Sequence, residues 1–128
     1  MSKTILIVDD EPHIRLLLEQ TLERLEQHDI EIATATNGRD ALKAIRSDRP
    51  AVVLLDVMMP VMNGFEVCKA VKADPALRDT FVAMLTAKGQ ELDRATGVEV
   101  GADLYLTKPF DPDDVLARVA KVLGIELG

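Results

Sequence analysis

The stretch that decides the fold is AVVLLDVMMPVMNG, residues 51–64. Its first five residues are all apolar, and a continuous apolar run of this length is typical of a strand buried on both faces. The run ends at Asp56, and a carboxylate there is costly to remove from water unless it is solvated, paired or bound to a metal. Because open α/β sheets bind ligands beyond the carboxyl ends of their strands, Asp56 is the first candidate for a functional residue.

Strand-like and helix-like segments alternate on both sides of this stretch. We predict strands at residues 4–8, 30–35, 51–55, 80–85 and 104–106, with residues 30–35 nearer an edge because they partly alternate in polarity. Helices are predicted from apolar residues at helical spacing: Ile14, Leu17, Leu18, Leu22 and Leu25; Ala41, Leu42, Ala44 and Ile45; Phe65, Cys68 and Val71; Val115, Leu116, Val119, Val122 and Leu123. A further helix at residues 90–100 is weaker, since it carries Gly97. Five strands alternating with five helices predict one doubly wound α/β domain over residues 1–128, with a parallel sheet.

Local signals mark several helix ends. Asn37 is a predicted N-cap, and Asp111 is another, with Pro112 at the first helical position. The helix that contains Cys68 should stop near residues 74–75, because proline disfavours a helical conformation in the residue before it. Gly101 fits a C-terminal cap for the helix at residues 90–100.

The composition narrows the classes of function. The chain has 128 residues, of which 48% are hydrophobic, and this suits one domain with a real core. No apolar stretch approaches the length of a membrane span, and the N-terminus reads as a strand rather than a signal peptide. The lone cysteine, Cys68, cannot form an internal disulfide, which fits a reducing cytoplasm. With 15 basic and 22 acidic residues the net charge is −7, so we expect no basic stripe and no nucleic-acid binding by this domain.

Polar side chains follow four of the five predicted strands. They are Asp9 and Asp10, Asp56, Thr86, and Lys108. The carboxyl ends of parallel strands share one edge of a sheet, so these side chains should lie together. Neighbouring carboxylates raise one another's pKa, and a divalent cation such as magnesium, which takes hard oxygen ligands, relieves the repulsion. The set predicts a phosphoryl-transfer site in which the carboxylate of Asp56 attacks phosphorus.

Each of these residues also has a purely structural interpretation. Asp9 and Asp10 could cap the following helix, Thr86 could be an ordinary loop hydroxyl, and Lys108 could be a solvated surface residue. One polar group at each of several strand ends favours a shared site over these separate explanations.

The motifs, taken together, resemble the receiver domain of two-component response regulators, including the chemotaxis regulators. They are IVDDE at residues 7–11, LLDVMMP at 54–60 with Met62 and Gly64 after it, LTA at 85–87, GAD at 101–103 and YLTKPF at 105–110. The resemblance covers essentially the whole chain. It implies a flavodoxin-like fold with strand order 2-1-3-4-5, and a cytoplasmic signalling switch that is no enzyme beyond catalysing its own phosphorylation and slow dephosphorylation.

The resemblance also implies the chemistry of the acidic residues. Asp56 would accept a phosphoryl group from a histidine kinase or a histidine phosphotransfer protein. Asp9, Asp10, Asp56 and the backbone carbonyl of Met58 would hold magnesium, or manganese in its place.

Further residues are assigned by the same resemblance. Lys108, Thr86 and Ala87 would contact the phosphoryl group, and the peptide bond between Lys108 and Pro109 would be cis, an arrangement that proline permits. Thr86 and Tyr105 match the family's switch pair. They would couple phosphorylation to the face formed by the helix at residues 90–100, the last strand and the last helix. That face would control a downstream protein or a fused output domain, and a phosphorylation-dependent homodimer is left open.

Two positions are expected to set the lifetime of the phosphoryl group. Met58 and Lys88 should flank the path of the hydrolytic water, and Met58 has no group able to orient it. The structural alternative is that Met58 merely fills space, as Met59 and Met62 are expected to do.

Two other functions are compatible with an α/β fold of this kind. A magnesium-dependent phosphatase with an aspartyl intermediate would need a second acid two residues after Asp56, where Met58 stands. A flavin-binding module would need a glycine- and hydroxyl-rich phosphate loop after the first strand, and aromatic rings, which make up only 3% of this chain. The sequence leaves open whether the chain stands alone or belongs to a longer protein.

Overall fold

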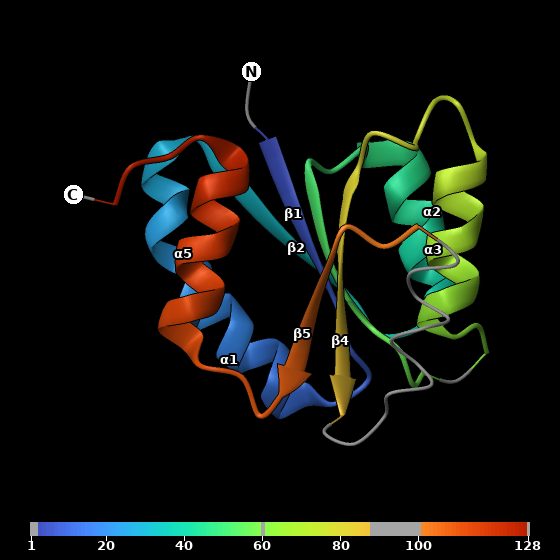
Figure 1. The fold of residues 1–128 in the computed structure, drawn as a ribbon, viewed down its shortest axis with the longest axis horizontal. Coiled ribbons are helices and arrows are strands. Elements are labelled where there is room, and N and C mark those ends of the chain that lie inside the picture. Colours follow the sequence, from blue (N-terminus) through green and yellow to red (C-terminus); the bar gives the residue numbers. More distant parts are fainter. Residues whose placement is uncertain (1–2, 60, 88–100, 128) are drawn as a thin grey trace.

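A parallel five-stranded sheet forms the centre of the molecule (Figure 1). The computed structural model describes residues 3–59, 61–87 and 101–127. The strands are β1 (Lys3–Val8), β2 (Ile30–Ala35), β3 (Val52–Asp56), β4 (Phe81–Ala87) and β5 (Leu104–Lys108). Their order is β2-β1-β3-β4-β5, with every neighbouring pair parallel, which confirms the predicted topology and the edge position of β2.

Helices cover both faces of the sheet. The structure has α1 (Pro12–Leu22), α2 (Gly38–Asp48), α3 (Gly64–Ala73) and α5 (Pro112–Leu123), with a short 3-10 helix η1 (Glu23–His28) after α1. Figure 1 shows α1 and α5 on one side of the sheet and α2 and α3 on the other. Four of the five predicted helices are therefore confirmed. The fifth, at residues 90–100, lies outside the described residues.

The core consists of two apolar layers, one on each face of the sheet. All five residues of β3 are buried. Leu54 belongs to the layer under α1 and α5, whereas Val53 and Leu55 belong to the layer under α2 and α3. Burying a Val or Leu side chain stabilises a fold by roughly 1.5–3 kcal/mol. Because β3 contributes buried side chains to both layers, it stabilises the packing on both faces of the sheet. The prediction of a strand buried on both faces is confirmed.

Two residues predicted for the core are exposed. Leu17 on α1 and Val122 on α5 have 37% and 40% of their surface accessible, while the adjacent Leu18 and Leu123 are buried. Neighbouring helical residues point about 100° apart, so a residue at the border of the apolar stripe can fall on either side of it. The apolar spacing also runs past the end of α1: Leu25 is buried, but it lies on η1.

Three of the predicted helix ends agree with the structure, whereas the cap predicted at Gly101 belongs to a helix outside the described residues. The side chain of Asn37 caps α2, and that of Asp111 caps α5 ahead of Pro112. Helix α3 ends at Ala73, just before the predicted stop at residues 74–75. These signals depend on neighbours in the chain, which is why sequence alone locates them.

Backbone contacts hold the loop between β3 and α3 at both ends. The Val57 N–H donates to the Leu85 carbonyl at 3.2 Å, and the Gly64 N–H donates to the Val57 carbonyl at 2.9 Å. Asn63 and Glu66 form a capping box at the start of α3. A Cβ atom on Gly64 would collide with the Asp56 carbonyl oxygen. Glycine at this position therefore allows α3 to begin directly against the end of β3.

We expect Gly64→Ala to lower the free energy of unfolding by roughly 2–3 kcal/mol, because the backbone of Asp56 must move to admit the methyl group. Gly124→Ala is the matched control: Gly124 has φ 71° and nothing within 4 Å of an added Cβ, so only backbone strain of about 1 kcal/mol applies. Urea unfolding of both variants measures the difference. A loss for Gly64→Ala no larger than that of the control would contradict the close approach.

Candidate functional site

The carboxyl edge of the sheet brings the predicted site residues together. Asp9 follows β1 and Asp56 is the last residue of β3. Thr86 is the next-to-last residue of β4, and Lys108 is the last residue of β5. Asp9, Asp56 and Thr86 are buried, although each carries a polar group. Buried polar groups need partners, so the contacts among these residues decide what the site can do.

A single ammonium group joins the two buried carboxylates. Nζ of Lys108 lies 3.0 Å from Oδ2 of Asp9 and 3.3 Å from Oδ1 of Asp56. Buried carboxylates repel each other and are poorly solvated, and the shared cation offsets both effects. The predicted convergence of Asp9, Asp56 and Lys108 is confirmed as geometry.

Two further contacts hold Asp9 in place. Its Oδ1 accepts a hydrogen bond from the Glu11 N–H at 2.9 Å, and its backbone carbonyl accepts one from Nη1 of Arg15 at 2.7 Å. The side chain of Asp9 is therefore used by the turn before α1 as well as by Lys108. The structure shows that this turn has Glu11 at the N-cap position without a side-chain cap, so Asp9 and Asp10 are not ordinary helix caps.

Carboxylate oxygens of Asp9, Asp10 and Glu11 lie within 4.8 Å of one another. Hard oxygen donors at this separation fit a cation such as Mg²⁺, which keeps several waters and uses few protein ligands. The ligand set predicted from the sequence is Asp9, Asp10, Asp56 and the Met58 carbonyl, and it stays a prediction. Glu11 is a further oxygen donor beside two of these residues, and the acidic run at residues 9–11 is the signal that could have pointed to it.

The electrostatics of the site centre on Asp56. The pKa of Asp56 is raised to about 7: burial raises it most and the charge of Asp9 adds to the rise, while the charge and hydrogen bond of Lys108 and a backbone hydrogen bond from Met58 lower it. Burial would lower the pKa of Lys108, but the hydrogen bond to Asp9 and the charges of Asp56 and Asp9 outweigh it and raise that pKa. Lys108 is therefore a permanent cation beside an acid that titrates near neutral pH.

Thr86 and Tyr105 lie on the same face of neighbouring strands. Tyr105 pairs in register with Met84, and both belong to the apolar layer under α2 and α3. Thr86 follows Met84 by two residues, so its side chain points to the same face. Thr86 is buried and Tyr105 is partly buried, and their role as a switch pair stays a prediction.

The remaining predicted residues lie around the same edge. The peptide bond between Lys108 and Pro109 is cis, as expected. Ala87 pairs with Lys108 at the ends of β4 and β5. Met58 has 63% of its surface exposed. Lys88 lies outside the described residues.

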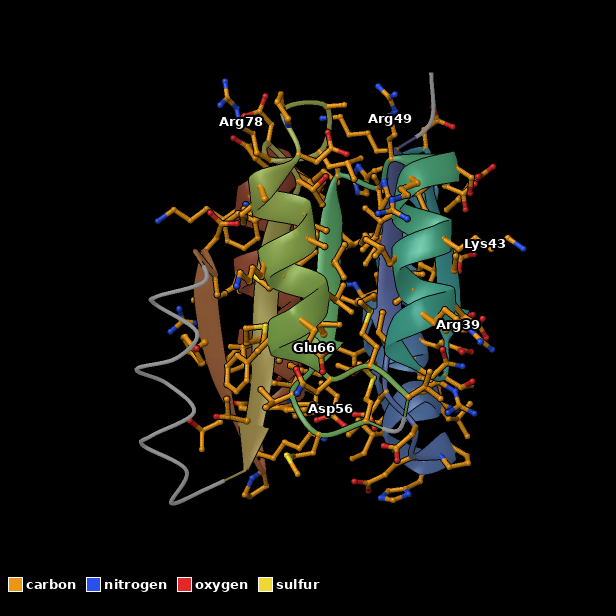
Figure 2. The ribbon with its side chains drawn as sticks, turned by 90° about the vertical axis from the view of Figure 1, so that its right-hand side faces the viewer. Arg39, Lys43, Arg49, Asp56, Glu66 and Arg78 are labelled. Carbon is orange, nitrogen blue, oxygen red and sulfur yellow. The ribbon has the colours of Figure 1, made fainter. Side chains whose placement is uncertain are left out.

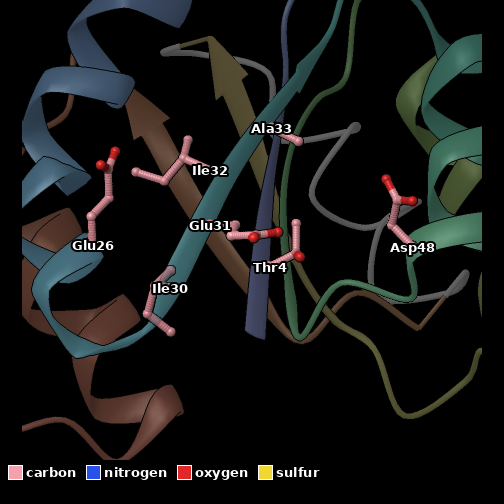
Figure 3. A pocket seen from close by; sticks show the side chains of 7 residues that line it. All are labelled: Thr4, Glu26, Ile30, Glu31, Ile32, Ala33 and Asp48. Atoms are coloured by element: carbon pink, nitrogen blue, oxygen red, sulfur yellow. The ribbon is translucent and has the colours of Figure 1, made fainter. Parts of the chain in front are cut away.

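A surface hollow of about 690 Å³ lies elsewhere, beside the edge strand β2 (Figure 3). Its lining consists of Thr4, Glu26, Ile30, Glu31, Ile32, Ala33 and Asp48. None of these residues is a predicted site residue. Thr4 and Ile30 lie at the amino ends of their strands, whereas the candidate site lies at the carboxyl ends. The candidate site is thus identified by its converging charges and not by its volume.

Comparison with known proteins points to one family. The family model described as the response regulator receiver domain matches residues 5–120. The chain is 44% identical over 123 residues to the alkaline phosphatase synthesis transcriptional regulatory protein PhoP of Bacillus subtilis, covering 96% of this chain and 49% of that protein. It is 44% identical to the transcriptional regulatory protein SrrA of Staphylococcus aureus, covering 96% and 48%. The chain therefore spans about half the length of these relatives.

Solved structures agree with this similarity. The chemotaxis response regulator CheY4 of Vibrio cholerae superposes with a TM-score of 0.82 at 36% identity, covering 95% of this chain and 99% of that one. The BeF3-activated DrrB receiver domain gives a TM-score of 0.83 at 35% identity, covering 97% and 99%. In the part of the chain that the structure describes, no helix has the length and apolar character needed to cross a bilayer.

The raised pKa of Asp56 predicts how its replacement changes stability with pH. The folded protein holds this proton more tightly than the unfolded chain, whose carboxyl has the ordinary value of 3.8, so the contribution is present below about pH 4 and is lost as pH rises through about 7. The Asp56→Asn variant has no carboxyl group at this position, so its stability does not fall in this way as pH rises. Without divalent cations, we expect its stability relative to wild type to increase on the order of 1–2 kcal/mol between pH 5 and pH 8.

Urea unfolding of both proteins at the two pH values, in chelator, measures this difference. Asp48→Asn is the control, because Asp48 is exposed on α2. A stability difference between Asp56→Asn and wild type that stays constant with pH would show that Asp56 titrates normally in the folded protein.

Proposed function

We propose that this chain, which belongs to the response regulator receiver domain family, accepts a phosphoryl group on Asp56 from a histidine kinase or a histidine phosphotransfer protein. The observation that carries the proposal is the pair of buried acids, Asp9 and Asp56, held by Lys108 at one edge of the sheet. The receiver domain of a two-component response regulator is a signalling switch rather than an enzyme acting on an external substrate.

The reaction forms one bond and breaks one bond. A carboxylate oxygen of Asp56 attacks phosphorus, the bond between phosphorus and the donor histidine nitrogen breaks, and the product is an acyl phosphate. Negative charge on the transferring oxygens needs nearby donors. Lys108 lies within hydrogen-bond distance of the attacking carboxylate, and the Thr86 hydroxyl and the Ala87 backbone lie on the adjacent strand.

The acidic cluster supports a role for a divalent cation. Asp9 and Asp10, with Glu11 beside them, offer the hard oxygen donors that Mg²⁺ prefers, and Mn²⁺ would be accepted by the same donors. We propose Asp56 and the Met58 carbonyl as further ligands. Bound there, the cation would offset charge on the phosphoryl oxygens and lower the pKa of Asp56, which favours the nucleophilic carboxylate at neutral pH.

The same geometry supports the proposed switch. A phosphoryl group adds up to about two negative charges and three acceptor oxygens. The buried Thr86 hydroxyl would donate to one of them, and the Tyr105 ring would turn into the space released on their common face of the sheet. The movement would alter β5, α5 and the predicted helix at residues 90–100, and so would change what that surface binds.

The partners follow from the family and from the length of the relatives. PhoP and SrrA are transcriptional regulators about twice as long as this chain, which supports control of a fused output domain. A separate downstream protein remains the alternative output, and a homodimer formed on phosphorylation is a further one. The proposed site of action is the cytoplasm, where a histidine kinase presents its phosphohistidine.

Acetyl phosphate tests the acceptor directly. With Mg²⁺, wild type should gain the mass of one phosphoryl group, because the small donor supplies the phosphorus that Asp56 attacks. Asp56→Asn should gain none, and a chelator should abolish labelling of wild type. Asp48→Asn, an exposed acid away from the site, should label normally. Phosphorylation of Asp56→Asn, or full labelling without a divalent cation, would refute the proposed chemistry; intact-protein mass spectrometry reads both.

Met58 is proposed to prolong the phosphorylated state. Its side chain is exposed beside Asp56 and cannot orient a water molecule by hydrogen bonding. Met58→Asn places an amide there and should speed dephosphorylation about tenfold, which corresponds to ~1.4 kcal/mol of barrier. Loss of phosphate after removal of the donor is the measurement, with Met59→Leu as a packing control. A rate equal to or slower than that of wild type would favour the alternative that Met58 only fills space.

A further inference from the structure

We infer that the solvent-facing side of α2 is a docking surface for an acidic amphipathic helix of a partner protein. This α2 surface consists of the cationic side chains of Arg39, Lys43 and Arg46 with Leu42 and Met62 between and beneath them. It lies on the outer face of a helix that contributes nothing to the acidic site, and no function proposed above uses it.

The three cations form one stripe. They are separated by four and three residues, which places their side chains above one another on a helix. All three are exposed. Figure 2 shows Arg39 and Lys43 extending from the same side of α2, the side turned away from α3. The acid nearest the start of the helix, Asp40, is turned toward the N-cap, where its carboxylate accepts a hydrogen bond from Asn37 at 2.9 Å.

The stripe is unpaired within the described structure. Lys72, Lys108 and Arg118 each form an ion pair with an acid, but over residues 3–59, 61–87 and 101–127 no such pair involves Arg39, Lys43 or Arg46. The chain carries a net charge of −7, so acids are plentiful, yet in the described part of the chain none forms an ion pair with this stripe. A local positive potential therefore remains on an otherwise acidic molecule.

The floor between the cations is apolar. The three cations line a groove of about 410 Å³ together with Leu42, Ser47 and Met62. Leu42 is buried and Met62 is half-buried, so the groove offers aliphatic and thioether surface between charged rims. An apolar floor with a charged rim is the usual anatomy of a protein-binding surface, and methionine adapts to the shape of what it contacts.

Backbone packing fixes the position of this floor. A Cβ atom on Gly38 would collide with the carbonyl oxygen of Met62, so the start of α2 lies directly against the loop that follows β3. The groove between α2 and Met62 is thus formed before any partner arrives, which reduces the ordering cost of binding.

The chemistry favours a protein helix over a nucleic acid. Three cations would neutralise only a few phosphates, and the rest of the chain would repel a polyanion. A phosphate backbone would also leave the apolar floor unfilled. A helix with carboxylates at positions i, i+4 and i+7 matches the spacing of the stripe, and an apolar residue at i+3 reaches the floor. The net charge of −7 does not reveal this stripe, because total charge hides a local arrangement.

A synthetic helical peptide with Glu at i, i+4 and i+7 and Leu at i+3 tests the surface. We expect amide shifts confined to α2 and Met62, and binding that weakens as salt is added. R39E/K43E/R46E should bind at least about tenfold more weakly, since three attractive contacts with the carboxylates of the peptide are replaced by repulsion. The control K69E/K121E changes exposed cations on α3 and α5 and should bind like wild type.

A milder variant, R39Q/K43Q/R46Q, removes the charges without reversing them and guards against loss of folding. Its urea midpoint should equal that of wild type and its binding should fall. Equal affinity of wild type and this variant, equal binding of a peptide with Gln in place of Glu, or tighter binding of a single-stranded oligonucleotide at the same residues would each overturn the inference. The test uses the unphosphorylated protein, so its failure leaves the proposed role of Asp56 untouched.

Discussion

The contact of one ammonium group with two buried carboxylates is the interaction on which the site depends. Lys108 stands on β5, two strands from β3 and three from β1, and neighbouring strands are roughly 4.8 Å apart. A short side chain on β5 would end too far from both acids, whereas the long side chain of Lys108 reaches Asp9 and Asp56 together. Breaking such a buried arrangement typically costs about 3–5 kcal/mol, because an uncompensated charge is left behind. The strand order therefore serves two purposes: it packs the sheet against its helices, and it brings Lys108 to the two buried acids.

Burial makes the charged form of Asp56 costly in free energy, and it also makes the charge of Asp56 sensitive to its surroundings. An acid with a pKa near 7 is close to balance between its charged and neutral forms, so a cation nearby changes its charge readily. The charge that the proposed phosphorylation would add has donors within reach, since Lys108 lies beside Asp56 and Thr86 is buried on the next strand. Because Thr86 shares its face of the sheet with Tyr105, a change in one hydroxyl is a change in core packing.

The sequence was sufficient where the governing forces are local or follow from topology. The buried run of β3 and the caps at Asn37 and Asp111 depend on neighbours in the chain, and the meeting of Asp56 with Lys108 follows from parallel strand order. Exposure of Leu17 could not be predicted, because it depends on how far α1 is rotated against the sheet. The pairing of acids with particular cations is also non-local: a list of charges does not say which cations are left without a partner.

Two close backbone approaches flank the loop between β3 and α3 and connect the two surfaces. Gly64 lies against the carbonyl of Asp56 at one end, and Gly38 lies against the carbonyl of Met62 near the other. Neither contact leaves room for a side chain, so a displacement of Asp56 that moved this loop would also move the floor of the α2 surface. Coupling of this kind is reciprocal in free energy. If a partner helix docks as inferred above and prefers one position of Met62, it would favour or oppose the proposed phosphorylation of Asp56 by the same amount that phosphorylation would favour or oppose its docking.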